Sequence, residues 1–230
     1  MTLSVFFSKV CRTLMKLRLK PIRVFCLHHV CQQFEADTMH ECDWMELEEF
    51  KQKINALLCQ GYQFISLTDA YNHLKKDWVR RKKFAVLTFD DGYTSMKEIL
   101  PWLAAQNIPS TLFVNGKYLD GKSYRETAKE RYLTYNELFA LSCHLIEIGH
   151  HGWEHNKVTE MTNAEFIASI EKNKKILSKH PCYIPFFAYT YGIHSNCYDR
   201  LLQKNNLIPV LVGGSRNYRW TGSIDRELLT

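Results

Sequence analysis

Short apolar runs alternate with longer amphipathic stretches along this chain, and glycine, proline and polar residues separate them. Short apolar runs predict buried strands, whereas apolar positions that recur every three or four residues predict helices. The strands predicted in this way are residues 23–27, 62–66, 83–89, 110–114, 145–148, 183–192 and 207–212. The predicted helices are residues 45–60, 68–76, 94–106, 134–144, 162–178 and 194–205.

Strands and helices that alternate in this order are typical of a parallel β/α fold. Their number predicts a distorted or incomplete (β/α) barrel of about seven strands, and an open doubly wound sheet is the alternative. With 230 residues, of which 46% are hydrophobic, the chain is large enough for one sizeable core, and a single domain is expected. The stretch 115–131 is polar and without clear periodicity, so we expect a loop or lid there.

Two adjacent carboxylates end the predicted strand 83–89. Asp90 and Asp91 follow the strand directly, and Gly92 comes after them. The carboxyl ends of parallel strands carry the active sites of α/β enzymes, and consecutive side chains there point in different directions. The pair can therefore divide two tasks, with one carboxylate binding a metal and the other moving a proton. An acidic turn that caps the next helix is the plainer alternative.

A second polar cluster, rich in histidine, follows the predicted strand 145–148. If the chain turns helical after this strand, His151 and His155 lie on one helix face, with Cβ atoms about 5–6 Å apart. Together with Asp91 they make a set of two histidines and one carboxylate, which leaves an open position for water, as a catalytic zinc ion requires. A solvated helix start that happens to be rich in histidine is the alternative.

A third segment, 183–192, is an aromatic strand that ends in Tyr-Gly, so its last N–H groups and phenols face the same end of the sheet. With this segment the chain resembles the polysaccharide deacetylase family, the NodB-homology group of carbohydrate esterases that remove N-acetyl or O-acetyl groups from glycans. Residues 88–93 match the first family motif in full, and residues 149–155 match the second with Gly152 in place of the usual serine or threonine. The third segment is most similar to the motif of exopolysaccharide N-deacetylases, and the resemblance covers residues 22–230.

The resemblance implies a distorted (β/α) barrel and a metal-dependent hydrolase. Its substrates are expected to be N-acetylated sugars of a polysaccharide or glycolipid, from which the enzyme removes the acetyl group. Asp91, His151 and His155 are implied to hold one divalent metal ion, with Zn²⁺ as the first candidate. Asp90 is implied to be the general base, and the backbone N–H of Tyr191 is implied to bind the oxyanion.

Three aromatic residues near these motifs, Trp153, Tyr189 and Tyr191, are candidates to stack on the sugar ring, although core packing is the commoner role of such side chains. Two other functions fit the same motifs. One is a non-catalytic glycan-binding or metal-binding protein on the same fold, and the other is a metal-dependent amidohydrolase that acts on a non-sugar amide.

The chain departs from the family at two positions that concern proton transfer. Many members carry an arginine in the third motif that orients the catalytic aspartate, and Ala188 occupies that position here. The family usually supplies a general-acid histidine near the C-terminus, but no histidine follows His194 in this sequence. His29, just after the first predicted strand, is therefore our candidate for the acid, because a histidine pKa of about 6.5 suits proton transfer near neutral pH. Hydrogen bonding within the barrel mouth is the alternative role of His28 or His29.

Charge and cysteine content narrow the partners and the compartment. The chain has 30 basic and 24 acidic residues, a net charge of +6, but no basic tract with interleaved aromatic residues, so no nucleic-acid partner is expected. Its eight cysteines form no Cys-x-x-Cys pair, and several lie in apolar stretches, which favours reduced thiols and a cytoplasmic location.

The N-terminal segment, residues 1–21, mixes apolar and basic residues. This mixture has neither the charge order of a secretory signal nor the uninterrupted length of a membrane span. The apolar positions are compatible with one helical face. We therefore expect either an interfacial helix that makes peripheral contact with the inner face of the membrane, or a helix packed on the barrel.

Overall fold

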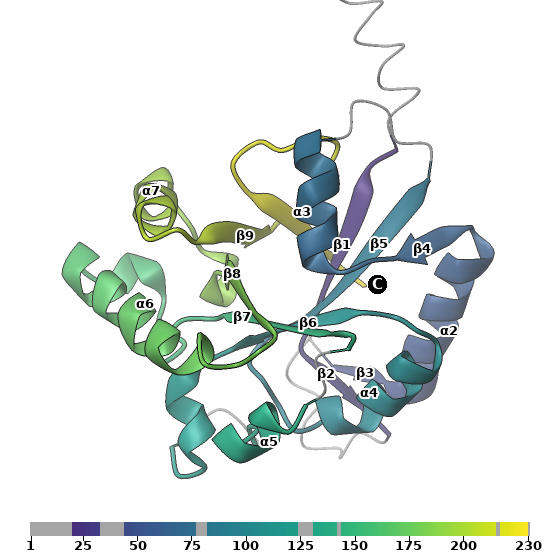
Figure 1. Cartoon of the computed structure of the whole chain (residues 1–230), viewed down its shortest axis with the longest axis horizontal. Coiled ribbons are helices and arrows are strands. Elements are labelled where there is room, and N and C mark those ends of the chain that lie inside the picture. Colours follow the sequence, from purple (N-terminus) through teal and green to yellow (C-terminus); the bar gives the residue numbers. More distant parts are fainter. Residues whose placement is uncertain are drawn as a thin grey trace, which may run out of the picture.

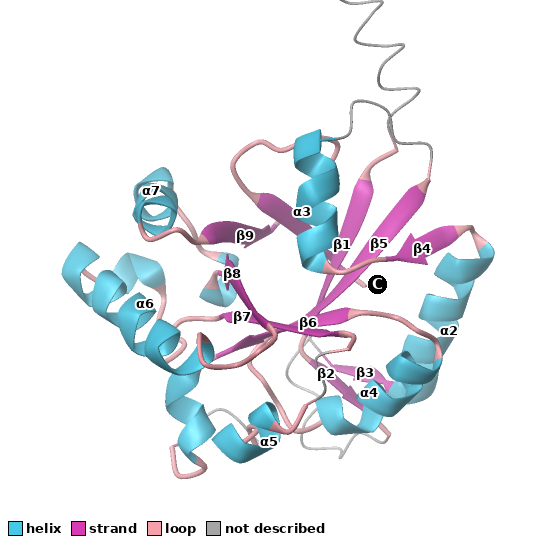
Figure 2. Cartoon of the chain, in the orientation of Figure 1, coloured by secondary structure: helices cyan, strands magenta, loops and turns pink. Residues whose placement is uncertain are grey.

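The structure is a computed structural model that describes residues 20–32, 44–76, 82–123, 131–141, 144–214 and 217–229. Its centre is a closed barrel of seven parallel strands with helices around the outside (Figures 1 and 2), which confirms the predicted barrel. The strands of the barrel are β1 (Ile22–Leu27), β5 (Lys83–Phe89), β6 (Ser110–Val114), β7 (Ile146–His150), β8 (Tyr183–Ala188), β9 (Ile208–Val212) and β10 (Ile224–Leu228).

The barrel is a closed ring because β1 has a neighbour on each side. Around the ring the strands follow the order β1, β10, β9, β8, β7, β6 and β5, and β5 pairs with β1 again. Ile22–Leu27 of β1 pairs in parallel with Phe84–Phe89 of β5. A short strand, β4 (Tyr62–Phe64), pairs with the start of β5 and is not part of the ring. A separate parallel pair is formed by β2 (His29–Cys31) and β3 (Trp44–Glu46).

Helices connect the strands, most of them on the outside of the ring (Figure 1). The helices are α2 (Leu47–Cys59), α3 (Leu67–Lys76), α4 (Met96–Ala105), α5 (Tyr135–Phe139), α6 (Asn163–Leu177) and α7 (Asn196–Lys204). Three short 3-10 helices are η2 (Gly116–Asp120), η3 (Val158–Glu160) and η4 (Thr190–Gly192). Capping boxes fix the starts of α5 and α6, because the side chains of Thr134 and Thr162 each accept a hydrogen bond from a backbone N–H three residues later.

Alternate residues of the strands face two different layers, as the two-residue period of a β-strand requires. Ile22 and Val24 of β1 belong to the cluster that fills the barrel. Phe25 and Leu27 belong to the cluster between the barrel and the outer helices α2 and α4. The phase of this alternation therefore decides which side chain of a strand reaches the interior.

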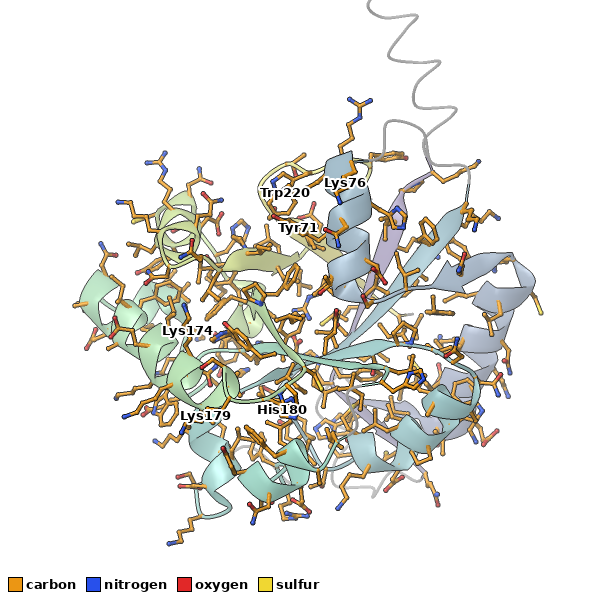
Figure 3. The ribbon with its side chains drawn as sticks, viewed as in Figure 1. Tyr71, Lys76, Lys174, Lys179, His180 and Trp220 are labelled. Atoms are coloured by element: carbon orange, nitrogen blue, oxygen red, sulfur yellow. The ribbon has the colours of Figure 1, made fainter. Side chains whose placement is uncertain are left out.

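Helix α3 fills the end of the barrel where the strands begin. Its Leu67 belongs to the cluster inside the barrel. The ring of its Tyr71 packs edge-on against that of Trp220, with ring centroids 4.9 Å apart (Figure 3). Glu147 of β7 accepts a hydrogen bond from the backbone N–H of Leu67 at 2.9 Å, so a carboxylate lies at the positive end of the helix. Because this end is filled, the functional groups lie at the opposite end, where the strands finish.

Among the differences from the prediction, two concern the barrel and its mouth. The strand β10 was not expected, because its sequence Ile-Asp-Arg-Glu-Leu is short and largely polar. The stretch 115–131, expected to be a loop or lid, begins with the 3-10 helix η2, in which Tyr118 and Leu119 are buried. Apolar side chains therefore anchor residues 116–120 to the barrel, which the polar composition of the stretch concealed.

The cysteines agree only in part with the prediction of reduced thiols. Cys182 is disulfide-bonded, so the prediction is wrong for this residue. Cys26, Cys31, Cys59 and Cys197 are present as thiols.

Residues 1–19 of the basic and apolar N-terminal segment lie outside the described residues, so the interfacial helix expected there stays a prediction. In the remainder, the described ranges contain no helix that combines the length and the apolar character needed to cross a bilayer.

Candidate active site and metal centre

The three predicted metal ligands come together at the carboxyl ends of β5 and β7. Asp91, His151 and His155 are all buried, and one ligand atom of each lies within 4.8 Å of the others. The Oδ1 atom of Asp91 lies 3.1 Å from Nε2 of His155 and 3.6 Å from Nε2 of His151. Two imidazoles and one carboxylate therefore converge on one point, which is a ligand set suited to catalytic zinc.

The two histidines do not meet on a helix, as the sequence spacing had suggested. Residues 151–157 contain no helical turn, and Gly152 and His155 have φ angles of 78° and 58°, in the left-handed region. These two positions bend the loop back on itself, so that the rings of His151 and His155 lie with centroids 5.0 Å apart. Gly152 replaces the usual serine or threonine at a position where a glycine adopts the required φ without strain.

The turn after β5 separates the two aspartates. Asp91 has a φ of 71° and Gly92 a φ of 82°, and a Cβ atom at Gly92 would lie only 2.7 Å from Cγ1 of Val114. Only glycine fits there, whereas aspartate is one of the few other residues that adopt this conformation with little strain. The bend directs Asp91 toward the histidines and leaves Asp90 beside the barrel axis.

The histidine loop is held by the segment that follows β6. The side-chain amide of Asn115 donates a hydrogen bond to the backbone carbonyl of His151. The hydroxyl of Tyr118 donates to the carbonyl of Glu154 at 3.0 Å. The start of the stretch expected to be a lid is therefore a support that fixes the backbone between the two candidate ligands.

The imidazole of His151 is prepared to bind a cation. Its Nδ1 lies 2.9 Å from the carbonyl oxygen of Ala188, and because a carbonyl only accepts, Nδ1 carries the proton. Burial lowers the pKa of His151, although Asp90 and Asp91 act in the opposite direction, so the ring is neutral at pH 7. Its Nε2 is buried without a hydrogen-bond partner and points toward Asp91. A neutral ring with one nitrogen held by a carbonyl is the usual arrangement of a metal-binding histidine.

Asp90 forms a two-point ion pair with Arg226 of β10. Oδ1 of Asp90 lies 2.6 Å from Nη1, and Oδ2 lies 2.8 Å from Nη2. Burial by itself raises the pKa of Asp90, but the charge and hydrogen bonds of Arg226, together with the nearby His151, outweigh burial, so the pKa lies well below its ordinary value. Burial likewise lowers the pKa of Arg226, but Asp90 raises it above its ordinary value. Both groups therefore stay charged inside the barrel.

The sequence pattern did not identify Arg226 as a site residue, although the family resemblance implied an arginine that orients the aspartate. Ala188 stands in the third motif where many relatives have an arginine, and Arg226 reaches the aspartate from a different strand. Its Nη1 also donates to Oγ1 of Thr88 at 3.0 Å. Ile224 and Arg226 face the barrel, and one polar residue lies between them. This alternation was the available signal, but a strand of five residues gives only a weak signal.

The structure places His28, not His29, beside Asp90. A nitrogen of His28, Sγ of Cys26 and an oxygen of Asp90 all lie within 4.8 Å of one another. His29 is 2% exposed, and its ring stacks between Trp44 at 3.9 Å and Tyr93 at 3.7 Å. Because Cys26 and His28 are two residues apart at the end of β1, they share the side that faces the barrel mouth, and His29 faces the outer layer.

The three aromatic residues that were candidates to stack on a sugar ring have different surroundings. Tyr189 is 1% exposed, its hydroxyl donates to Oδ1 of Asp199 at 2.8 Å, and its ring packs in the core, so the prediction that it stacks on a sugar is wrong. Trp153 lies against Gly116 and lines a cavity of about 330 Å³ beside α6. Tyr191 is 59% exposed, and its ring centroid lies 4.6 Å from that of His155. Tyr191 is therefore the accessible aromatic side chain next to the three candidate ligands.

Comparison with known protein sequences points to the same family as the three motifs. A family model described as polysaccharide deacetylase matches residues 79–209. YxkH of Bacillus subtilis (strain 168), itself named as a polysaccharide deacetylase, is 26% identical over 130 residues, which make up 56% of this chain and 44% of that protein. The chain therefore spans less than half the length of this curated relative.

Two solved structures illustrate the shared fold. IcaB from Ammonifex degensii superposes with a TM-score of 0.77 at 19% identity, covering 93% of each chain. The deacetylase PplD from Streptococcus pyogenes superposes with a TM-score of 0.77 at 18% identity, covering 91% of this chain and 92% of PplD. At these identities the likeness establishes a shared fold over nearly the whole chain.

Proposed function

The chain belongs to the polysaccharide deacetylase family, and on this premise we propose that it is a metal-dependent hydrolase that removes acetyl groups from N-acetylated sugars of a polysaccharide or glycolipid. The observation that carries the proposal is the adjacency of two groups of residues. A buried Asp-His-His set, suited to a cation, lies next to an aspartate that a buried arginine keeps ionised. Hydrolysis of an amide needs both an electrophile for the carbonyl and a base for the water.

Asp91, His151 and His155 are the residues that would hold the ion. When bound there, a divalent ion such as Zn²⁺ supplies a Lewis acid and lowers the pKa of a water molecule toward about 7. Asp90, next to this set, would accept the proton of the water that attacks the acetyl carbonyl. Arg226 holds both oxygens of Asp90 in place, so the carboxylate needs no reorientation before it accepts the proton.

His28 is the residue that we assign to proton donation. The amine that leaves the acetyl group needs a proton, and an imidazole beside the base is suited to supply it. His28 lies at the barrel mouth with Asp90, whereas His29, our choice from the sequence, is held between two aromatic rings. A protonated imidazole at His28 can therefore reach a group bound next to Asp90, and His29 cannot.

Tyr191 is assigned two contacts with the substrate. Its backbone N–H is the donor that family members use for the oxyanion, and one such donor is worth about 2.7–4 kcal/mol of barrier. Its exposed ring beside His155 offers an apolar face for a sugar. The acetate bound in the structure of PplD is the product that this reaction would release.

The experiment that tests this function compares the two aspartates. We expect Asp90→Asn to keep one equivalent of zinc and to lose most acetate release from an N-acetylglucosamine oligomer, because an amide cannot accept the proton. We expect Asp91→Asn to lose zinc first. Asp69→Asn, in the first turn of α3, is the matched control and should resemble the wild type in both measurements.

The outcomes separate the alternatives. Near wild-type acetate release by Asp90→Asn would remove the general base from the proposal. Acetate release from small acyl amides but not from the sugar oligomer would favour an amidohydrolase of a non-sugar amide. Binding of the oligomer without acetate release by the zinc-loaded wild type would favour a non-catalytic glycan-binding protein.

A further inference from the structure

A second group of metal-binding side chains lies beside the first. Sγ of Cys26, a ring nitrogen of His28 and a carboxylate oxygen of Asp90 all lie within 4.8 Å of one another. Cys26 and Asp90 are buried and His28 is half-buried. The thiol of Cys26 donates to Oδ2 of Asp90 at 3.6 Å. The proposed reaction uses Asp90 and His28, but it leaves Cys26 without a task.

The register of two neighbouring strands fixes this group. Cys26 of β1 lies opposite Thr88 of β5 in the parallel pairing. His28 and Asp90 each come two residues further along, so they lie opposite one another on the same side of the two strands. Cys26 lies on β1 itself, whereas His28 and Asp90 directly follow β1 and β5, so the parallel pairing of the two strands brings the three side chains together.

We infer that Cys26, His28 and Asp90 form a second cation site, which takes zinc or a similar thiophilic ion and inhibits the enzyme when it is filled. A thiolate with an imidazole is a ligand pair that suits Zn²⁺ and Co²⁺ and is unsuited to Mg²⁺ or Ca²⁺. Sulfur distinguishes this site from the first, whose ligands are one oxygen and two nitrogens. The inhibition rests on the proposed function, whereas the binding does not.

The second site fills only after the first. Arg226 already occupies both oxygens of Asp90 with hydrogen bonds, so a cation there meets a fixed positive charge. The thiol of Cys26 must also lose its proton to solvent when the sulfur binds the ion. The set of Asp91, His151 and His155 has neither obstacle. A cation at the second site binds the base and the proton donor at once, so turnover stops while the first ion stays in place.

The spectroscopic experiment uses the full-length, metal-free chain and Co²⁺ as the probe. Sulfur bound to cobalt produces a thiolate-to-metal charge-transfer band in the near ultraviolet. We expect the first equivalent of Co²⁺ to bind without this band and the second to produce it. Cys26→Ser should bind the first equivalent and show no band, since serine keeps a donor to Asp90 but is a poor zinc-type ligand. Cys59→Ser, at the exposed end of α2, should behave as the wild type.

Activity supplies the second readout. Excess Zn²⁺ should inhibit acetate release by the zinc-loaded wild type. Cys26→Ser should keep its basal activity and raise the zinc concentration for half-inhibition by at least about tenfold, because even an indirect contact to a metal is worth that much.

Three outcomes would overturn the inference. These are a second equivalent of Co²⁺ that brings no charge-transfer band in the wild type, a band that persists in Cys26→Ser, and zinc inhibition that this variant leaves unchanged. If Cys26→Ser did not fold, the wild-type titration alone would decide, because the band with the second equivalent is either present or absent. A further outcome is that neither the wild type nor any variant releases acetate, while the charge-transfer band appears in the wild type and is absent from Cys26→Ser. In that case the proposed function would be wrong and the second site would still be supported.

Discussion

Arg226 holds Asp90 through two hydrogen bonds of 2.6 and 2.8 Å, although 136 residues separate them in the chain. The arginine comes from the last strand of the barrel and the aspartate from the end of β5. A planar guanidinium that binds both carboxylate oxygens fixes the orientation of the carboxylate as well as its charge. We therefore propose that this ion pair takes over the task that the family resemblance assigns to an arginine of the third motif.

Removal of Arg226 should change the acid side of the pH profile. In Arg226→Met the charge that lowers the pKa of Asp90 is lost while burial still raises it, so the pKa rises and the acid limb of kcat/KM moves to higher pH. Arg226→Lys keeps the charge but loses the two-point contact, so its limb should move less. Measured pH–rate profiles of the two variants check this, and an acid limb that stays in place in Arg226→Met would contradict it.

The same pair should contribute to stability in a pH-dependent way. Asp90 has a lower pKa in the folded than in the unfolded chain, so its contribution is fully present above the unfolded value of about 3.9 and is lost as the pH falls through the folded value. At pH 7 we expect Arg226→Met to reduce the free energy of unfolding by about 3–5 kcal/mol, because it leaves a buried charge unpaired. Urea titrations of wild type and variant measure this difference.

The metal ligands are tested by zinc content. His151→Ala or His155→Ala should each abolish tight binding of the first zinc ion, because the two ligands that remain cannot replace a directional bond. His144→Ala, an exposed histidine before β7, serves as the control and should keep one equivalent. Full zinc occupancy of either buried-histidine variant, determined by elemental analysis, would show that the ligands lie elsewhere.

The assignment of the proton donor is tested by two neighbouring histidines. His28→Ala should keep the first zinc ion and lower the rate of acetate release by about 10²–10⁴, which is the usual effect of losing a positioned acid. His29→Phe keeps an aromatic ring between Trp44 and Tyr93 and should retain the rate. The reverse result, with the rate lost only in His29→Phe, would restore the residue chosen from the sequence.

The support of the histidine loop is tested at Tyr118. Tyr118→Phe removes the hydroxyl that donates to the carbonyl of Glu154 but leaves the ring that stacks on Tyr132 at 4.7 Å. We expect zinc affinity to fall by about 10-fold, as for other groups that orient a metal ligand indirectly, while the free energy of unfolding changes by only about 1 kcal/mol. A competition titration with a chelator measures the affinity, and an unchanged zinc affinity would show that the loop needs no such support.

The N-terminal segment is tested with vesicles. We expect the full chain to sediment with vesicles of anionic lipid and a chain without residues 1–21 to remain in the supernatant, because basic and apolar residues together bind such surfaces. Neutral vesicles are the control for charge. Location in the cytoplasm stays a prediction, and cell fractionation tests it. Equal sedimentation of the two chains would assign any membrane contact to the barrel.

Local patterns in the amino-acid sequence were enough to predict the barrel and the identity of the candidate ligands. A run of apolar residues that ends in Asp90 and Asp91 is a local signal, and so is the spacing of His151 and His155 after another apolar run. Because parallel strands end on the same face, local signals at two strand ends suffice to predict that these side chains meet. The capping boxes at Thr134 and Thr162 depend only on residues three positions apart, so they too are local features of the sequence.

Only the tertiary structure decided which partners complete the site. The phase of β1 places His28 rather than His29 at the mouth, and a shift of one residue at the strand end would exchange them. Arg226 meets Asp90 because the ring closes through β10, whose five residues are too polar to be predicted as a strand. Contacts of this kind form between distant parts of the chain, so their energy depends on closure of the whole barrel and leaves no periodic pattern in the local sequence.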